Sequence, residues 1–494
     1  MTRRLAVLGV LLSACAVGPG YHPTPVVPPA TKVGTAASSE SSKTFFDSLA
    51  AARAADTVPG PAATELMPPR SIRAESLADL AWLDILHDSL LNGLVTTALH
   101  QNRDLAVAEA RVREYRAVEG VARAPLFPSL TATGAVSRQQ VVLAGFAVAP
   151  VDYSLWLLEA NVSWELDFWG RIRRGLQAAT ADLRGQEAAE RAAALSIVAQ
   201  VASGYLTLLE LDQEQVIAEQ TLAGRREEYQ LAERRYAQGV VSELDVRQFE
   251  AQIAIPAARL AQVQQLRSQQ EHALNALVGE GPAPIRRGTS LLAAVRAIAV
   301  PDSLPSTLLE RRPDVQESER AYAAAVARVG AADAARLPTF TISGYGGTQS
   351  ATAGDIFSQQ TGIYQALAGF SLPLFTGGRL VNQARAARAR ADQAHWQYEQ
   401  TVLTALREAG DALVAARSAR DQVTALDTQA KALRRGLQLA QVRYTSGLSN
   451  YLEVLDAQRS LFDAEIALSQ AELGQLNAAV QLYKALGGSW GSAH

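Results

Sequence analysis

The sequence predicts a mixed fold that combines a β-barrel segment with a long α-helical coiled coil, built twice along the chain. Three observations predict it. Two long stretches, 171–239 and 379–447, contain no proline, short segments that precede each of them alternate polar and apolar residues, and the chain resembles itself at a spacing of 208 residues. Alternation is the pattern of a half-buried strand, and long proline-free stretches are typical of helices.

Composition excludes several classes of function. The 494 residues hold 46 basic and 49 acidic side chains, so no basic surface for a nucleic acid is expected. Six scattered histidines and a single cysteine give no metal-ligand spacing. The stretch "GGSWG" (487–491) matches a nucleophile pattern, but it follows a predicted helix and lacks a downstream acid. We therefore expect no enzyme, no cofactor and no metal site.

The N-terminus is predicted to be a lipoprotein signal peptide over residues 1–14. Arg3 and Arg4 precede a short apolar core, as in secretory signals. The stretch "LSAC" resembles a bacterial lipobox, which makes Cys15 the expected site of lipidation; an ordinary signal peptide that happens to contain a cysteine is the alternative. Residues 15–75 are rich in proline and serine, so we expect an extended, lipid-anchored segment without its own core.

The internal repeat sets the predicted domain organisation. "RYAQG" (235–239) recurs as "RYTSG" (443–447), and the match continues on both sides. This predicts repeat 1 over 76–280, a linker over 281–300, repeat 2 over 301–490 and a tail over 491–494. Each repeat is expected to run as a helix, a β-hairpin, a long helix and a return helix.

Each repeat is expected to supply one β-hairpin, giving four strands per chain. "NVSWELDF" (161–168) and "PTFTISGY" (338–345) alternate most clearly. Four strands leave open edges, which are costly in lipid, and a symmetric oligomer would close them; three copies give twelve strands. A soluble α+β protein is the alternative. Nearby aromatic residues would suit an interfacial girdle: Tyr153, Trp156, Trp164, Trp169, Tyr364 and Phe375.

The second long helix carries a sustained heptad pattern, which predicts coiled-coil packing. Many of the positions are alanine, so neighbouring helices can approach closely. The two sets of heptad positions are Val402, Ala409, Ala416, Val423, Ala430, Leu437 and Tyr444, and Ala405, Ala412, Ala419, Leu426, Leu433 and Ala440.

Several motifs together resemble one known family. These are the lipobox, "LLERRPDVQESERAYAAA" (308–325), "LPLFTGGR" (372–379) and the two repeated tips. They are similar to the outer-membrane factors of tripartite efflux systems, in the TolC/OprM-like, NodT-type group of outer-membrane lipoproteins. The resemblance implies a homotrimer in the outer membrane, with a twelve-stranded barrel and an α-helical tunnel that projects into the periplasm. It also implies two partners, a periplasmic adaptor protein and an inner-membrane RND-type pump.

The repeated tips are the candidate functional site. Gly239 and Gly447 are expected to end the long helices. Ser242-x-x-Asp245 and Asn450-x-x-Glu453 look like capping boxes that start the return helices. On this reading, the carboxylates of Asp245 and Glu453 could serve only as caps.

The family pattern adds roles at the tips. It implies that Asp456 and Glu453 form acidic rings at the periplasmic constriction, and that Asp245 and Tyr444 belong to the network that closes it. Where some members have a basic residue, this chain has Ser449, so closure would depend more on hydrogen bonds and apolar contacts. An acidic ring predicts a cation-preferring pore. The expected adaptor-docking residues, which alternatively only pack the hairpin, are Val240, Val241, Leu448 and Tyr451.

The leading functional hypothesis is thus a passive duct for small molecules, gated at the tips and powered by a separate pump. The alternative is a lipid-anchored periplasmic coiled-coil scaffold without a pore.

Overall fold

The computed structural model describes residues 19, 32–33, 88–141, 151–297, 304–305 and 311–488. Two compact units account for them: the first contains 110–187 and 317–399, and the second contains 24–109, 188–316 and 400–494. The predicted signal peptide, Cys15 and the tail over 491–494 lie outside the described residues, as does most of 15–75.

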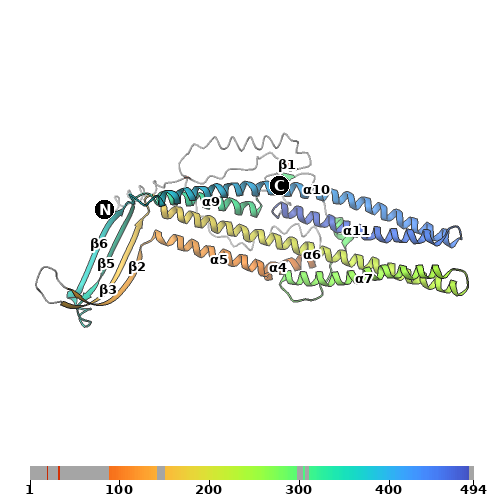
Figure 1. Cartoon of the computed structure of the whole chain (residues 1–494), viewed down its shortest axis with the longest axis horizontal. Helices are drawn as coiled ribbons and strands as arrows, with labels where there is room; N and C mark the ends of the chain where they lie inside the picture. Colours follow the sequence, from red (N-terminus) through yellow and green to blue (C-terminus); the bar gives the residue numbers. More distant parts are fainter. Residues whose placement is uncertain are drawn as a thin grey trace. The chain divides into compact units, whose positions relative to one another are not determined.

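The first unit contains a four-stranded antiparallel sheet (Figure 1). Its strands are β2 (Ser129–Val141), β3 (Val151–Leu166), β5 (Thr339–Ser350) and β6 (Gly362–Ser371). Their order is β2-β3-β5-β6, so each predicted hairpin is present and the two hairpins join through β3 and β5. This sheet therefore contains the four strands of the two predicted hairpins, and β2 and β6 are its edges.

The strand register separates an apolar face from a polar face. Directly opposed residues share a face. The apolar face contains the pairs Leu130–Val162, Trp164–Ile342 and Phe340–Phe370, whereas the polar face contains Thr131–Asn161, Thr133–Glu159 and Gln139–Tyr153. The apolar face is uncovered in the single chain: the side chains of Leu130, Phe370 and Tyr364 are 72%, 71% and 89% exposed.

The helices of the first unit form a layer in the order α5-α6-α9-α10. Thr180 of α6 (Arg171–Ala237) donates to Glu119 of α5 (Arg103–Arg123) at 3.1 Å. Arg328 of α9 (Pro313–Ala334) pairs with Asp182 of α6. Arg388 of α10 (Arg379–Thr445) pairs with Asp333 of α9 at 2.8 Å. Helices α5 and α10 are therefore the edges of the layer, as β2 and β6 are the edges of the sheet.

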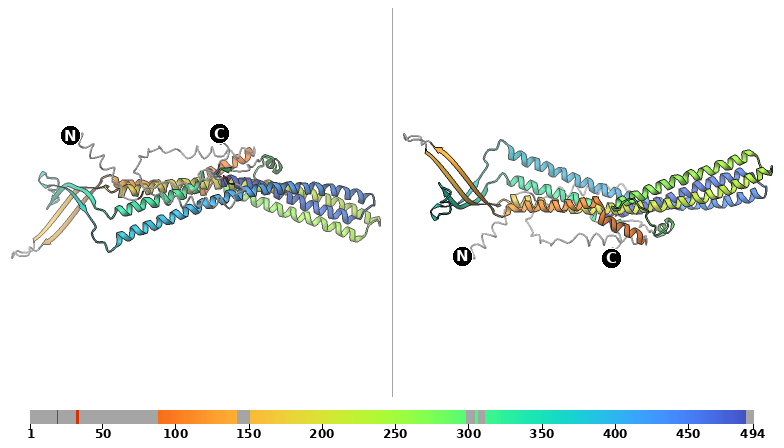
Figure 2. Two further views of the ribbon diagram at one scale, coloured as in Figure 1. Left: turned by 90° about the horizontal axis from the view of Figure 1, so that it is seen from above. Right: turned by 90° about the horizontal axis from the view of Figure 1, so that it is seen from below.

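The second unit is built from two helical hairpins that pack side by side (Figure 2). One pairs α6 with α7 (Glu243–Val278), and the other pairs α10 with α11 (Tyr451–Ala485). Helices α6 and α10 each have 67 residues, which corresponds to about 100 Å of helix. The predicted seam on α10 is confirmed as its packed face, since Val402, Ala405 and Ala409 are at most 1% exposed.

The first helical stretch of repeat 1 differs from the prediction of one continuous helix. It breaks at Asn102 into α4 (Ser89–Gln101) and α5. The backbone of Asn102 is extended, its Oδ1 accepts from the Leu105 amide at 3.0 Å, and its Nδ2 donates to the Leu277 carbonyl at 2.8 Å. An asparagine that caps one helix and ties it to α7 explains the break.

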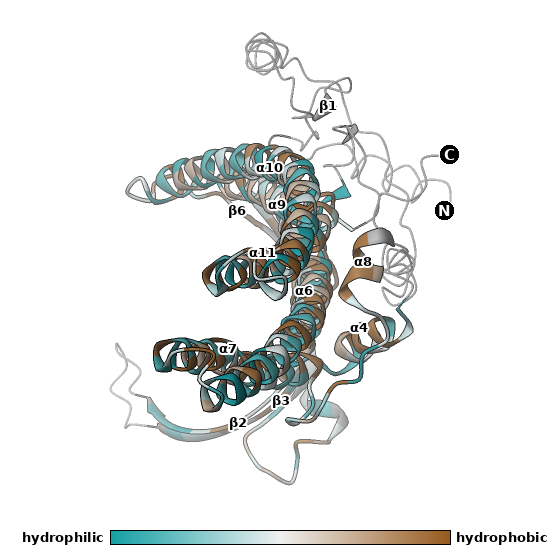
Figure 3. Cartoon of the chain, turned by 90° about the vertical axis from the view of Figure 1, so that its right-hand side faces the viewer, coloured by the Kyte–Doolittle hydropathy of each residue, from teal (hydrophilic) through white to brown (hydrophobic). Residues whose placement is uncertain are grey.

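Helix α4 packs on one side of α6, together with α8 (Leu291–Ala297) from the predicted linker (Figure 3). One apolar cluster joins Leu91 of α4, Tyr205 of α6, Leu291 of α8 and Leu476 of α11. Two further short strands, β1 (Lys32–Val33) and β4 (Leu304–Pro305), pair antiparallel.

Helix α6 also contains the one stretch among the described helices that is long and apolar enough to cross a membrane, by length and composition alone. Half of that stretch is buried inside the protein. The side chains of Val201, Ala202 and Leu208 on α6 are fully buried within the apolar cluster that joins it to α4 and α11. Core packing therefore accounts for the apolar composition of this helix.

Candidate functional site: the helix tips

The two hairpins turn through the same backbone geometry. At the first tip, the Gly239 amide donates to the Tyr236 carbonyl at 2.9 Å, and at the second, the Gly447 amide donates to the Tyr444 carbonyl at 3.0 Å. Gly239 and Gly447 have φ values of 71° and 72°. This left-handed conformation favours glycine and ends each long helix where predicted.

The caps of the two return helices differ. Ser242 and Asp245 form the predicted capping box, in which each side chain accepts a hydrogen bond from the other's backbone amide. The second predicted capping box is wrong, because the Asn450 side chain makes no capping hydrogen bond. The carboxylate of Glu453 instead pairs with the guanidinium of Arg443 at 3.5 Å. Glu453 thus links the two ends of the turn.

The aromatic residues of the tip fill the space between the hairpins. The Tyr451 ring lies 3.9 Å from the Phe249 ring and is 8% exposed. Arg235 of α6 donates to the Tyr444 hydroxyl of α10 at 3.1 Å. Tyr451 therefore packs between the hairpins, as in the alternative considered for the expected docking residues. Val241, also expected to dock, lines a cavity of about 140 Å³ beside Tyr444.

A buried polar clamp beneath the tip was missed by the sequence reasoning. Gln458 of α11 accepts from Arg225 of α6 through Oε1 and donates to Glu228 of α6 through Nε2. The Tyr451 hydroxyl also donates to Glu228, at 3.4 Å. Burial raises the pKa values of Glu228 and Tyr451. The missed signal was Gln458 itself, a polar residue on the buried stripe of Tyr451, Val454 and Phe462.

The remaining predicted tip residues lie at the surface. The acidic side chains of Glu453 and Asp456 are exposed on α11. The apolar side chains of Val240 and Leu448 are 67% and 72% exposed. The repeat-related residues Leu244 and Leu452 are 66% and 55% exposed, so each tip presents two apolar side chains.

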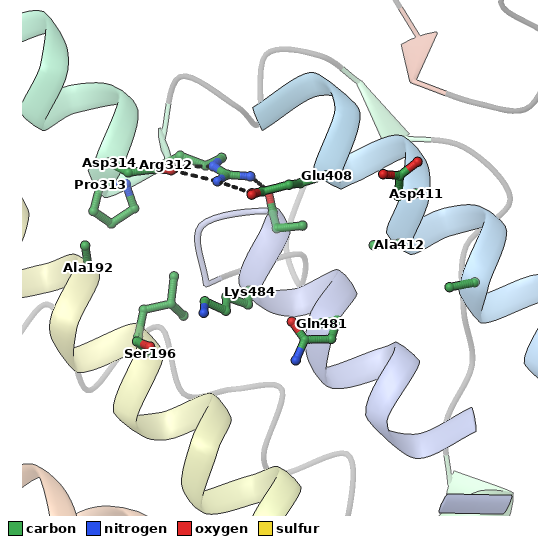
Figure 4. Close-up of a pocket in the computed structure, with 13 residues that line it drawn as sticks. Ala192, Ser196, Arg312, Pro313, Asp314, Glu408, Asp411, Ala412, Gln481 and Lys484 are labelled. Atoms are coloured by element: carbon green, nitrogen blue, oxygen red, sulfur yellow. Dashed lines mark hydrogen bonds and ion pairs between the residues drawn. The ribbon is translucent and has the colours of Figure 1, made fainter. Parts of the chain in front are cut away.

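A second polar centre lies where α9 begins, beside a cavity of about 540 Å³ (Figure 4). The buried Arg312 guanidinium donates to Asp314 and Glu408, both at 2.7 Å, and to the Ala485 carbonyl at 3.1 Å. Pro313 is the first residue of α9. Arg312 connects the start of α9 to α10 and to the end of α11.

Comparison with known proteins identifies the family. The family model described as "Outer membrane efflux protein" matches residues 94–280 and 304–488. The probable efflux pump outer membrane protein TtgC of Pseudomonas putida is 37% identical over 84% of this chain and 86% of its own. The cation efflux system protein CusC of Escherichia coli is 30% identical over 84% of this chain and 90% of its own.

Solved structures agree with the sequence matches. The outer-membrane channel OprN superposes with a TM-score of 0.79 at 30% identity, over 96% of this chain and 100% of its own. The residues matched by the family model include both hairpins and both repeated regions described above. This chain belongs to the outer membrane efflux protein family.

Proposed function

We propose that this protein is the outer-membrane channel of an efflux system, and that it works as a passive trimeric duct gated at its helix tips. The observation that carries the proposal is the sheet, which has one uncovered apolar face and two open edges. An apolar sheet face of this kind is suited to contact with lipid, and the polar face to a water-filled lumen.

The open edges call for other copies of the chain. Each unpaired backbone group in lipid costs roughly several kcal/mol. The sheet has β2 at one edge and β6 at the other, and the helix layer has α5 and α10 at the corresponding edges. Strand β6 of one chain can therefore pair with β2 of the next chain, and α10 can pack on the α5 of that chain. Such a head-to-tail contact closes into a ring. Three copies of the tandem repeat give the twelve strands that the family resemblance implies.

The proposed duct is lipid-anchored through Cys15 and works with two partners. Relatives are named as parts of efflux systems, one as part of a toluene efflux pump and one as part of a cation efflux system. By analogy, an inner-membrane pump, of the RND type, would supply the energy, and a periplasmic adaptor would join it to the channel. The exposed side chains of Val240, Leu244, Leu448 and Leu452 at the tips are the surface we assign to the adaptor.

Closure of the duct would rest on contacts between the two hairpins of each chain. Arg235 with Tyr444, and the clamp of Arg225, Gln458 and Glu228, join α6 to the second hairpin. Some family members have a basic residue at the position of Ser449. In this chain, the contacts between the hairpins would hold the tips closed in its place. Loss of these contacts would let the second hairpin move away from the first.

Conductance measured in a planar lipid bilayer tests the proposal. The purified full-length protein should form discrete channels, and it should run as a heat-modifiable trimer in gel electrophoresis. A coiled-coil scaffold, the competing function, predicts neither channels nor a trimer that is stable in detergent. A monomer without conductance would therefore exclude the duct.

Ion selectivity tests the acidic ring. In a trimer, the exposed carboxylates of Glu453 and Asp456 would crowd one narrow opening and concentrate cations there. The double variant Glu453→Gln, Asp456→Asn should lose most of the cation preference, measured as the reversal potential in a salt gradient. The variant Glu243→Gln, which removes an exposed carboxylate from the first return helix, serves as the control. Unchanged selectivity in the double variant would remove these two residues from the constriction.

A further inference from the structure

Two buried carboxylates lie one turn apart on α6, away from the tips. Glu210 and Glu214 are 5% and 1% exposed. Residues four positions apart share one face of a helix, so both side chains enter the same space between α6, α7 and α11. Like charges held this close in a buried space repel each other strongly.

Only one of the two carboxylates has its hydrogen bonds satisfied. Arg259 of α7 donates to both oxygens of Glu214, at 2.6 and 2.5 Å, and Gln470 of α11 donates to Glu214 at 3.0 Å. The Oε1 atom of Glu210 is buried without a hydrogen-bond partner. Buried polar atoms normally take part in a hydrogen bond. A proton bound to the Glu210 carboxyl group would supply the hydrogen for one.

The charges around Glu210 do not balance. The ionisable groups that face Glu210 are the Glu214 carboxylate on its own helix and the Arg259 guanidinium on α7, whereas α11 presents the uncharged side chains of Ser469 and Gln470. Two carboxylates facing one guanidinium leave one negative charge buried, and an uncompensated buried charge is strongly destabilising. Binding one proton makes the cluster neutral. Consistent with this, burial and the Glu214 carboxylate raise the pKa of Glu210 to about 8.

We propose that Glu210, Glu214 and Arg259 form a proton-binding site between the two hairpins, and that its occupancy controls how tightly α11 packs against α6 and α7. The proton comes from solvent and is held on Glu210, which then donates a hydrogen bond to Glu214. The remaining negative charge on Glu214 stays paired with Arg259. The site depends on the packing within one chain and not on the duct proposed above.

The direction of the pH effect follows from the sign of the shift. The folded protein binds this proton more tightly than the unfolded chain does, because the folded pKa is the higher of the two. The contribution to stability is therefore fully present below the ordinary carboxyl pKa of about 4.3 and is lost as the pH rises through about 8. Deprotonation of Glu210 leaves a second negative charge between α6, α7 and α11. Its repulsion with Glu214 loosens the packing of α11.

The experiment compares thermal unfolding of the full-length wild type and Glu210→Gln in detergent, from about pH 6 to about pH 9.5. Glutamine keeps the shape of a neutral glutamic acid. The wild type should lose several degrees of melting temperature over this range, and Glu210→Gln should lose much less. Glu219→Gln, an exposed carboxylate on the same helix, is the matched control and should behave as the wild type.

Infrared spectroscopy on the wild type provides a readout that does not need the variant to fold. A protonated carboxyl carbonyl band should be present at about pH 6 and disappear near pH 8, far above the ordinary carboxyl pKa of about 4.3. Absence of that band at about pH 6, or a Glu210→Gln variant that keeps the wild-type pH dependence, would overturn the proposal.

Discussion

Replacing Leu158 by arginine should prevent assembly of the protein in the outer membrane. Leu158 lies in the middle of β3, on the apolar face, and is 42% exposed in the single chain. A charged residue facing lipid near the midplane of a barrel costs about 2–4 kcal/mol per copy. A trimer would incur that cost three times. The measurement is the yield of heat-modifiable trimer in outer-membrane fractions, which we expect to fall below a tenth of the wild-type value.

The neighbouring residue provides the control. Leu157→Arg makes the same change one position away, where the side chain lies in the polar face with Ala135 and Gln349 opposite. Because successive residues of a strand point to opposite faces, this arginine should face the lumen and be tolerated. If the two variants assembled equally well, the assignment of the apolar face to lipid would fail.

Replacing Arg312 by leucine should strongly destabilise the helical unit. The guanidinium is buried and holds Asp314, Glu408 and the Ala485 carbonyl (Figure 4). Breaking a fully buried ion pair costs about 3–5 kcal/mol, and the cost here should be smaller, because the carboxylates of Asp314 and Glu408 are 43% exposed and partly screened by water. We expect a melting temperature several degrees lower in circular dichroism, together with loss of efflux-dependent resistance in cells.

Arg311→Leu is the matched control, because the adjacent arginine is exposed. It should unfold as the wild type does. Adding Glu408→Gln to Arg312→Leu removes one of the stranded charges and should recover part of the lost stability, as expected for coupled residues. A wild-type melting curve for Arg312→Leu would show that the ion pairs contribute little.

Regular patterns allowed much of the fold to be predicted. The absence of proline and the heptads of α10 gave the long helices to within a few residues, since these features act locally along one helix. The repeated glycines located both turns. The break at Asn102 was not predicted, because it depends on the Leu277 carbonyl, which lies 175 residues away in the sequence.

The polar centres show the same limit of sequence patterns. Gln458 and Arg312 are buried where partners from other helices meet them, and the sequence around each does not specify those partners. A polar residue on an otherwise apolar stripe is the available signal, and Gln458 carries it. The predicted cap at Asn450 is absent, and Glu453 pairs with Arg443 on the other side of the turn instead.

The two turns share one backbone geometry but differ in the side chains beside them. Gln458 of the second hairpin is buried in the clamp, whereas the residue that the repeat aligns with it, Glu250, is exposed and pairs with Arg247. A ring of three such chains would thus have six turns of nearly equal shape but of two alternating kinds. A binding protein that contacts only the backbone and apolar ends would find six equivalent places. One that distinguishes side chains would find three, so the channel itself sets two possible stoichiometries for whatever binds it.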